Sequence, residues 1–243
     1  SPILERRQKR NLKALNYNIK WHKSFIDVPD GPLIFIANEL FDVLPIQQFV
    51  KLTNNWVERK VGCNAMGQLI WIQDRNCVLS KELIPQQFFR SKLGSVFELS
   101  QVGTELVSNI TKSVVKFGGA ALIIDYGHIE SGIGDTLQAV KNHNYCDVLS
   151  EPGKADLTAH VDFERLANSV KINGGLGCGP VTQRDFLRRL GIETRAEQLK
   201  SSSSTRLKSE VLTGLNRLIG IKEMGNLFKV LAIVQPTQTC PEG

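Results

Sequence analysis

The sequence has no long hydrophobic run. Of its 243 residues 42% are hydrophobic, but no apolar stretch approaches the roughly 20 residues that a membrane-spanning helix requires. Residues 1–13 carry many charges and lack the apolar core of a secretory signal peptide. We therefore expect neither a membrane span nor an export signal.

Cysteine is scarce and irregularly spaced. The five cysteines are far apart, odd in number and include no CxxC pair, so the sequence predicts neither a disulfide framework nor a zinc site, and we expect no bound metal. We interpret all five as free thiols in a reducing compartment. They are Cys63, Cys77, Cys146, Cys178 and Cys240.

The sequence also lacks a phosphate-binding loop and a nucleic-acid-binding pattern. Residues 174–179 are glycine-rich but lack the Gly-Lys-Ser or Gly-Lys-Thr of a phosphate loop, so we interpret them as a turn. The formal net charge is +6, with basic residues concentrated at 6–13 and 184–189. A solvated helix face explains both clusters at least as well as nucleic acid does, and no interleaving of aromatic and basic residues supports a nucleic-acid partner.

The clearest positive feature is an apolar run followed at once by polar residues. Residues 33–37 are apolar, as in a central parallel strand buried on both faces, and Asn38, Glu39 and Asp42 follow. Ligands of open α/β sheets bind outside the carboxyl ends of the strands, so this pattern indicates chemistry at a strand end. An equally good interpretation is that Asn38 and Asp42 make a turn and cap a helix.

A second apolar run repeats the pattern. Residues 120–124 are expected to form a buried strand, and Asp125, Tyr126 and His128 follow it. If the two strands are neighbours in a parallel sheet, their polar tails face the same crevice. Asp125 could equally accept backbone N–H groups at the strand end, and His128 could be a hydrogen-bonded structural histidine.

Other elements follow from periodicity and turn residues. A helix with Ser1 as N-cap opens the chain, a β-meander occupies residues 46–75, and a long polar loop occupies residues 128–162. Expected strands cover residues 18–22, 47–52, 56–62, 68–73 and 227–234, and expected helices cover residues 84–93, 101–116, 163–170, 182–190 and 210–218.

Seven longer strings of the sequence occur in a specific order. They are IFIANELFDVLPIQQFV, WVERKV, GGAALIIDYGH, GDTLQAV, DLTAHVDF, GPVTQRDFL and MGNLFKVLA. Together they resemble the MidA family of S-adenosylmethionine-dependent methyltransferases, over residues 1 to about 233. The resemblance implies an α/β class I methyltransferase fold, which is Rossmann-like, with a mostly parallel seven-stranded sheet, a final antiparallel strand and an inserted β-meander.

The resemblance also implies an activity and a setting. The family includes a mitochondrial member that methylates an arginine of a respiratory complex I subunit, so we expect S-adenosylmethionine as cofactor and a protein arginine as acceptor. The bacterial cytoplasm or the mitochondrial matrix fits such a protein. Two alternatives stay open: a non-catalytic assembly or chaperone-like module, and a methyltransferase for a small molecule or nucleic acid.

The family's two main cofactor anchors have no counterpart in this sequence. They are a glycine-rich loop after the first strand and an acidic residue that ends the second strand. We therefore interpret residues 1–243 as a partial methyltransferase domain that is incomplete at its N-terminus.

Specific residues are expected to form the site. Glu39 and Asp42 suit a guanidinium, which carboxylates bind in fork geometry. Asn38, with Ser24 and Phe25 at the adenine edge, is expected to contact the cofactor. The expected border of the substrate crevice consists of Asp125, His128 and His160.

Overall fold

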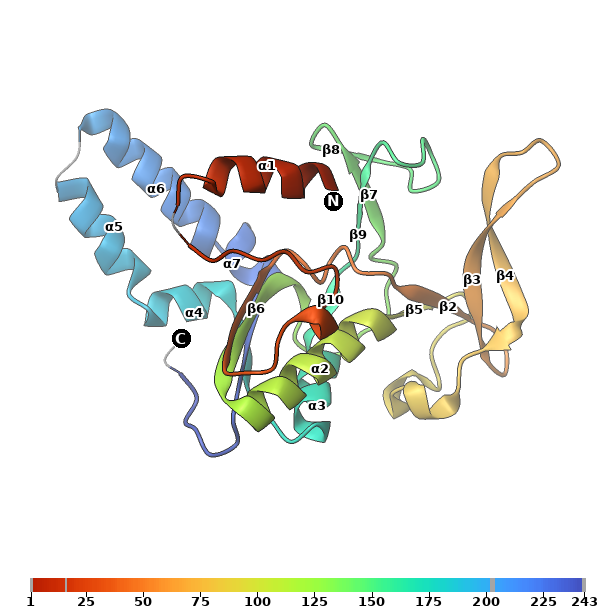
Figure 1. Cartoon of the computed structure of the whole chain (residues 1–243). Helices are drawn as coiled ribbons and strands as arrows, with labels where there is room; N and C mark the ends of the chain where they lie inside the picture. Colours follow the sequence, from red (N-terminus) through yellow and green to blue (C-terminus); the bar gives the residue numbers. More distant parts are fainter. Residues whose placement is uncertain (1, 16, 202–203, 242–243) are drawn as a thin grey trace.

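A mixed five-stranded sheet forms the centre of the protein. The computed structural model describes residues 2–15, 17–201 and 204–241. The sheet consists of β1 (Leu33–Asn38), β6 (Gly119–His128), β10 (Val161–Asp162), β11 (Leu176–Thr182) and β12 (Phe228–Val234). Its strand order is β1-β6-β12-β11, with β10 paired to β6 as well (Figure 1).

The register of the sheet confirms two predictions. β1 and β10 run parallel to β6, whereas β12 runs antiparallel to both β6 and β11. The two apolar runs are therefore parallel neighbours, and the last strand is antiparallel. However, β6 extends to His128, so Asp125 lies within the strand instead of beyond its end.

Two helices cover one face of the sheet. They are α2 (Gln101–Phe117), in which the Ser100 hydroxyl accepts the Gly103 N–H, and α3 (Phe163–Ile172), in which the Asp162 side chain accepts the Arg165 N–H. Their apolar faces pack on the sheet because the apolar residues recur at helical spacing. The core contains the fully buried side chains of Val107, Ile110, Val114, Ile123, Val170, Leu231 and Ile233.

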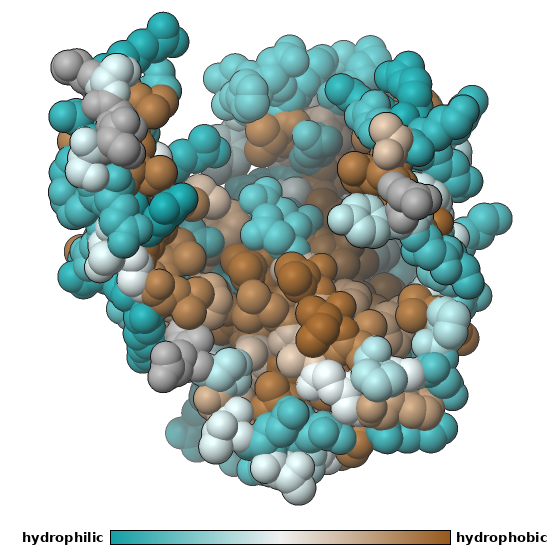
Figure 2. Space-filling view, turned by 60° about the vertical axis from the view of Figure 1, so that its left-hand side comes forward, coloured by the Kyte–Doolittle hydropathy of each residue, from teal (hydrophilic) through white to brown (hydrophobic). Residues whose placement is uncertain are grey.

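The opposite face of the sheet is open along β1. Ile34 and Ile36 are 74% and 69% exposed, so the prediction that this run is buried on both faces was wrong. β1 is an edge strand in the described part of the chain, and α1 (Pro2–Leu12), which is helical as predicted, buries none of its residues. Ser1 lies outside the described residues. Figure 2 shows apolar side chains gathered in a hollow of the molecule, and a groove of about 400 Å³ lies along this face.

The β-meander predicted over residues 46–75 belongs to a separate antiparallel sheet. Three of its strands, β2 (Gln47–Lys51), β3 (Trp56–Cys63) and β4 (Leu69–Val78), match the predicted ones, and β5 (Val96–Leu99) joins them in the order β4-β3-β2-β5. Residues 84–93 form no α-helix; they contain only the 3-10 turn η3 (Gln86–Phe88), after η2 (Lys81–Leu83). Ile84 and Phe88 are buried in a small core with Trp56 and Phe97, and this packing overrides the helical pattern.

The expected long loop contains a third, small sheet. β7 (Gln138–Lys141), β8 (Asn144–Cys146) and β9 (Asp156–Thr158) pair in the order β8-β7-β9. Their short strands, three or four residues each, gave too little alternation to predict.

Three further expectations need correction. Residues 18–22 form no strand, and residues 174–179 are not a turn throughout, because β11 begins at Leu176. Cys178 and Cys240 form a disulfide, so these two are not free thiols. The cysteines lie 62 residues apart in the sequence, and only the folded chain brings their Cα atoms to 5.5 Å.

The C-terminal part is helical before the last strand. It contains α4 (Gln183–Arg189), α5 (Ile192–Ser201), α6 (Thr205–Ile219) and α7 (Met224–Leu227). The first and third were predicted, although α6 begins earlier than expected. Across the described ranges, no helix is both long enough and apolar enough for a membrane crossing.

The small core of the meander predicts a large mutational effect. Phe97 is fully buried and packs on Trp56 and Phe88. We expect Phe97→Ala to lower the free energy of unfolding by about 3–5 kcal/mol, because it removes ring contacts and leaves a cavity. Urea denaturation measures this change. Leu93→Ala in the same lobe, where the side chain is 69% exposed, is the control and should change the value by less than about 0.5 kcal/mol.

Candidate functional site

The carboxylate of Asp125 joins β6 to the segment that follows β1. Its Oδ2 accepts the backbone N–H groups of Leu40, Phe41 and Asp42 at 3.1, 2.9 and 3.3 Å. Its Oδ1 accepts the N–H of Tyr126 at 2.9 Å. Asp125 is fully buried, so it serves as the predicted acceptor of backbone N–H groups and does not reach solvent.

Asp42 lies beside this carboxylate and joins three elements. Its side chain is buried, and its Oδ2 accepts the Tyr126 hydroxyl at 2.7 Å. Its carbonyl oxygen accepts the Ala159 N–H at 2.9 Å, next to β9. The other carboxylate oxygen, Oδ1, is buried and has no hydrogen-bond partner among the described residues. Such an oxygen costs free energy unless a ligand, water or proton satisfies it.

The ionisation of the Asp125 carboxyl group is disturbed by its surroundings. Burial, followed by the charge of Asp42, raises the pKa of Asp125 to about 7. The backbone N–H groups that Asp125 accepts act in the opposite direction. Burial also raises the pKa of Tyr126, so its hydroxyl stays protonated and donates to Asp42.

A cavity of about 250 Å³ lies at the carboxyl end of β6. We call it the histidine pocket, because His128 from β6 and His160 next to β10 both line it. Burial, followed by the nearby His128, lowers the pKa of His160, so this imidazole is uncharged at neutral pH. The ring of His160 meets that of Tyr126 edge to face at 5.7 Å, which places the pocket beside Asp42.

Arg165 supplies a cation to the histidine pocket. Its Nη2 donates to the Leu83 carbonyl oxygen at 3.1 Å. Its Nε is buried without a hydrogen-bond partner in the described ranges, although it lies 3.9 Å from Asp162 Oδ2. Arg165 therefore brings a positive charge to the wall of the pocket.

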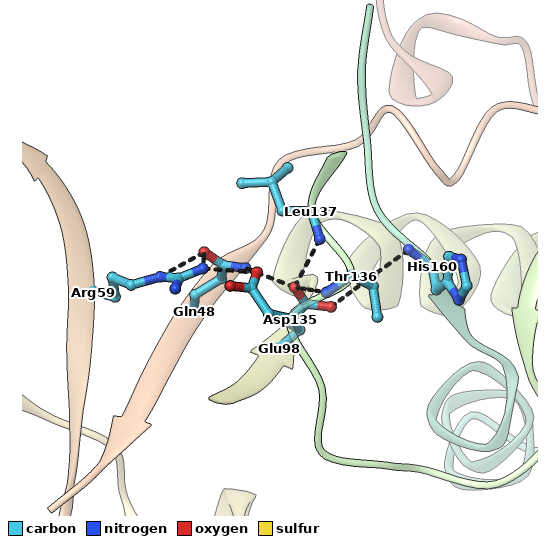
Figure 3. A network of polar contacts seen from close by, with 7 residues as sticks. All are labelled: Gln48, Arg59, Glu98, Asp135, Thr136, Leu137 and His160. Carbon is cyan, nitrogen blue, oxygen red and sulfur yellow. Dashed lines mark hydrogen bonds and ion pairs between the residues drawn. The ribbon is translucent and has the colours of Figure 1, made fainter. Parts of the chain in front are cut away.

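A chain of polar contacts connects the histidine pocket to the meander (Figure 3). Glu98 accepts the Thr136 hydroxyl, the Thr136 N–H at 3.0 Å and the Gln48 amide at 2.7 Å. The Thr136 hydroxyl oxygen accepts the His160 N–H at 2.9 Å. On the other side, Gln48 Oε1 accepts two N–H groups of Arg59, at 3.0 and 2.6 Å. This network fixes residue 160 relative to β2 and β3.

Asn38 and Glu39 lie at the carboxyl end of β1 and are exposed. Glu39 has a positive φ of 51°, which is uncommon for a residue other than glycine. The Asn38 amide lies 3.5 Å from Glu39 Oε1. Residues with such backbone conformations are concentrated at functional sites. The exposed Asn38–Glu39 pair is therefore a candidate for ligand binding at this strand end.

Ser24 and Phe25 lie elsewhere. The Ser24 hydroxyl caps the 3-10 turn η1 (Phe25–Asp27) by accepting the Ile26 N–H. The Phe25 ring packs edge to face on Phe35, at 6.0 Å between ring centres. Neither residue lines the histidine pocket, and their assignment to the cofactor stays a prediction.

The structure thus brings four predicted residues together and adds others. Asp42, Asp125, His128 and His160 surround one region of the strand ends. The sequence did not predict that Glu98, Thr136 and Arg165 belong to this site. They come from three distant segments of the chain, which only the fold brings together. Gly127 had only a weak one: a Cβ atom there would lie 2.0 Å from the Val161 carbonyl oxygen, so only glycine permits this approach of β10.

Comparisons with known proteins identify relatives of the chain. Residues 1–180 match the model of a family described as "Putative S-adenosyl-L-methionine-dependent methyltransferase". The chain is 37% identical to the "Protein arginine methyltransferase NDUFAF7 homolog, mitochondrial" of Caenorhabditis elegans, over 94% of this chain and 54% of that protein. It is 36% identical to the "Protein arginine methyltransferase NDUFAF7, mitochondrial" of Danio rerio, over 89% and 50% respectively. The chain therefore spans about half the length of these relatives.

Two crystal structures of proteins from Burkholderia thailandensis share the fold. One has a TM-score of 0.82 at 23% identity and covers 98% of this chain and 65% of its own. The other, bound to S-adenosyl-homocysteine, has a TM-score of 0.83 at 24% identity and covers 98% and 62%. These structures confirm the predicted α/β fold class.

The ionisation of Asp125 predicts a specific dependence of stability on pH. Its pKa of about 7 in the folded chain exceeds its value in the unfolded chain, so the folded state binds the extra proton in between. The free energy of unfolding of the wild type, minus that of Asp125→Asn, should fall as pH rises from about 4 to about 7. The total fall should reach at most roughly 4 kcal/mol, with a plateau above about pH 8.

Urea denaturation at a series of pH values measures this difference. Asp30→Asn is the control, because the Asp30 side chain is 79% exposed, and its difference should stay flat. A flat difference for Asp125→Asn as well would mean that Asp125 is ionised throughout this range.

Proposed function

This chain belongs to the family of S-adenosyl-L-methionine-dependent methyltransferases, and on that premise we propose that the protein methylates an arginine of a protein substrate. The relatives named as protein arginine methyltransferases support the acceptor. The observation that carries the proposal is the exposed Asn38–Glu39 pair at the carboxyl end of β1, where Glu39 has φ of 51°. Open α/β sheets bind their ligands at this position.

The residues present fit part of S-adenosylmethionine. The amino acid end of the cofactor needs hydrogen-bond donors and acceptors, and the exposed Asn38 amide offers both. The bound cofactor supplies a methyl group on a sulfonium, which is a good leaving group. Asn38 at the end of β1 is therefore the residue of this chain that we propose for the cofactor, alongside parts of the family's fold that this chain does not span.

Glu39 is the proposed partner of the acceptor guanidinium. Its carboxylate is exposed, so it can bind a guanidinium in fork geometry and aim one nitrogen. Asp42 offers only Oδ1, because its Oδ2 accepts the Tyr126 hydroxyl. We therefore propose that Glu39 makes the first contact and that Asp42 Oδ1 supplies a second acceptor oxygen, whose burial cost the guanidinium would offset.

The histidine pocket offers a proton acceptor. A guanidinium nitrogen that gains a methyl group must lose a proton. His160 suits this role because burial lowers the pKa of its imidazole and keeps it uncharged. His128 lines the same pocket and is the second candidate.

The setting and the acceptor are extensions of the same proposal. The curated relatives are named as mitochondrial proteins, which supports a mitochondrial matrix location for this protein; a bacterial cytoplasmic location is the alternative. An arginine of a respiratory complex I subunit remains the acceptor that we propose from the family resemblance.

Replacement of Glu39 tests the proposal. We expect Glu39→Gln, in the protein at its native length, to lower the yield of methylarginine by about ten-fold or more, because the neutral amide loses the charged fork contact. The assay uses methyl-labelled S-adenosylmethionine and mitochondrial protein extract, and it quantifies methylarginine after acid hydrolysis. Binding of S-adenosyl-homocysteine should stay unchanged.

The matched control is Glu210→Gln, a surface residue of α6 that pairs with Arg206. It should leave the yield unchanged. An undiminished yield in Glu39→Gln would contradict the role of Glu39. If the native-length wild type neither binds S-adenosyl-homocysteine nor forms methylarginine, the non-catalytic assembly module becomes the better interpretation.

A further inference from the structure

A second, larger groove adjoins the histidine pocket. It has a volume of about 580 Å³ and lies between the β3–β4 hairpin and residues 148–157. Ile46 lines both the groove and the pocket, and the adjacent residues Thr136 and Leu137 line one each. We call it the meander groove; it meets the histidine pocket at Ile46.

The charges along the meander groove are paired within the protein. Arg59 Nη2 lies 2.8 Å from Asp135, and Lys60 Nζ lies 3.0 Å from Glu58. Glu151 pairs with Lys141 and with Lys154. No large excess of one sign remains, so this groove does not suit a polyanion such as nucleic acid.

Aromatic and aliphatic side chains form the rest of the wall. Trp71 from β4 is 37% exposed, and the guanidinium of Arg59 lies 4.4 Å from the centre of its ring. Val61 and Leu157, also in the lining, are 50% and 49% exposed. A rigid aromatic ring stacked with arginine is typical of surfaces that bind polypeptide.

The geometry also favours an extended occupant. Within the described part of the chain, β9 pairs with β7 alone, so no further strand continues this small sheet on the other side of β9. Leu157 of this strand lines the groove, and Ala159 two residues later lines the histidine pocket. A chain lying along the groove would thus pass the pocket.

We propose that the meander groove binds an extended segment of the protein substrate next to the acceptor arginine, whose side chain enters the histidine pocket past Ile46. This inference rests on the proposed function. Because the groove's own charges are paired, the flanking residues that it selects are apolar or neutral. A peptide that contacts Arg59 would be connected to the backbone of His160 by the hydrogen bonds of Gln48, Glu98 and Thr136 (Figure 3).

Peptide binding tests the proposal without any methyl transfer. The probe is a pool of fluorescein-labelled synthetic peptides of about 15 residues, with a central arginine and randomised neutral flanks. Fluorescence anisotropy measures its affinity for the wild type, for Trp71→Ala and for Leu157→Ser, which alter opposite walls of the groove. We expect each variant to weaken binding by about ten-fold.

Tyr145→Ala is the control, because Tyr145 is 78% exposed on β8 outside the groove. It should bind the pool like the wild type. Hydrogen exchange should show peptide-dependent protection of β3, β4 and residues 148–157. All variants should keep the circular dichroism spectrum and melting temperature of the wild type. Because the two variants alter different walls of the groove, the test still stands if one of them does not fold.

Three outcomes would overturn the inference. The first is that the peptide pool does not bind the wild type, and the second is that both variants bind the pool as tightly as the wild type does. The third is that the groove is protected from hydrogen exchange without peptide and sedimentation detects a dimer, which would assign the groove to a second copy of the chain. Failure of the proposed function looks different: groove-dependent peptide binding would persist while no methylarginine forms.

Discussion

The buried carboxylate of Asp125 is the interaction on which the arrangement of the site depends. It accepts four backbone N–H groups, three of them from the turn after β1. This contact sets where β1 ends, and therefore where Asn38 and Glu39 reach solvent. Because a buried carboxylate is stable only when its oxygens are satisfied, the turn and the strand constrain each other.

Asp42 and Tyr126 extend this constraint toward the histidine pocket. The Tyr126 hydroxyl donates to Asp42, and its ring contacts His160. The Glu98 network fixes residue 160 from the opposite side, through Thr136. The two imidazoles of the pocket thus stand on backbone that is fixed from both the main sheet and the meander, which suits a site that must position an acceptor.

The open face of the sheet is a separate feature. Ile34 and Ile36 are exposed on an edge strand, a combination that proteins normally cover or blunt. Neither the histidine pocket nor the meander groove lies on this face. Residues of α2 and α3 line the pocket, whereas the meander and residues 148–157 line the groove. The chain itself spans about half the length of its relatives.

Local patterns in the sequence determined the elements, and long-range packing determined the site. The apolar runs and the turn residues of the meander predicted most of the strands and helices, because hydrophobic period and turn chemistry are encoded within a few residues. Residues 84–93 escaped prediction because the burial of Ile84 and Phe88 decides their conformation. The strands β7 to β9 escaped it because they are only three or four residues long. The disulfide between Cys178 and Cys240, and the contacts of Tyr126 with Asp42 and His160, join residues that are 34 or more positions apart. No local pattern encodes such contacts, so only the tertiary structure decided them.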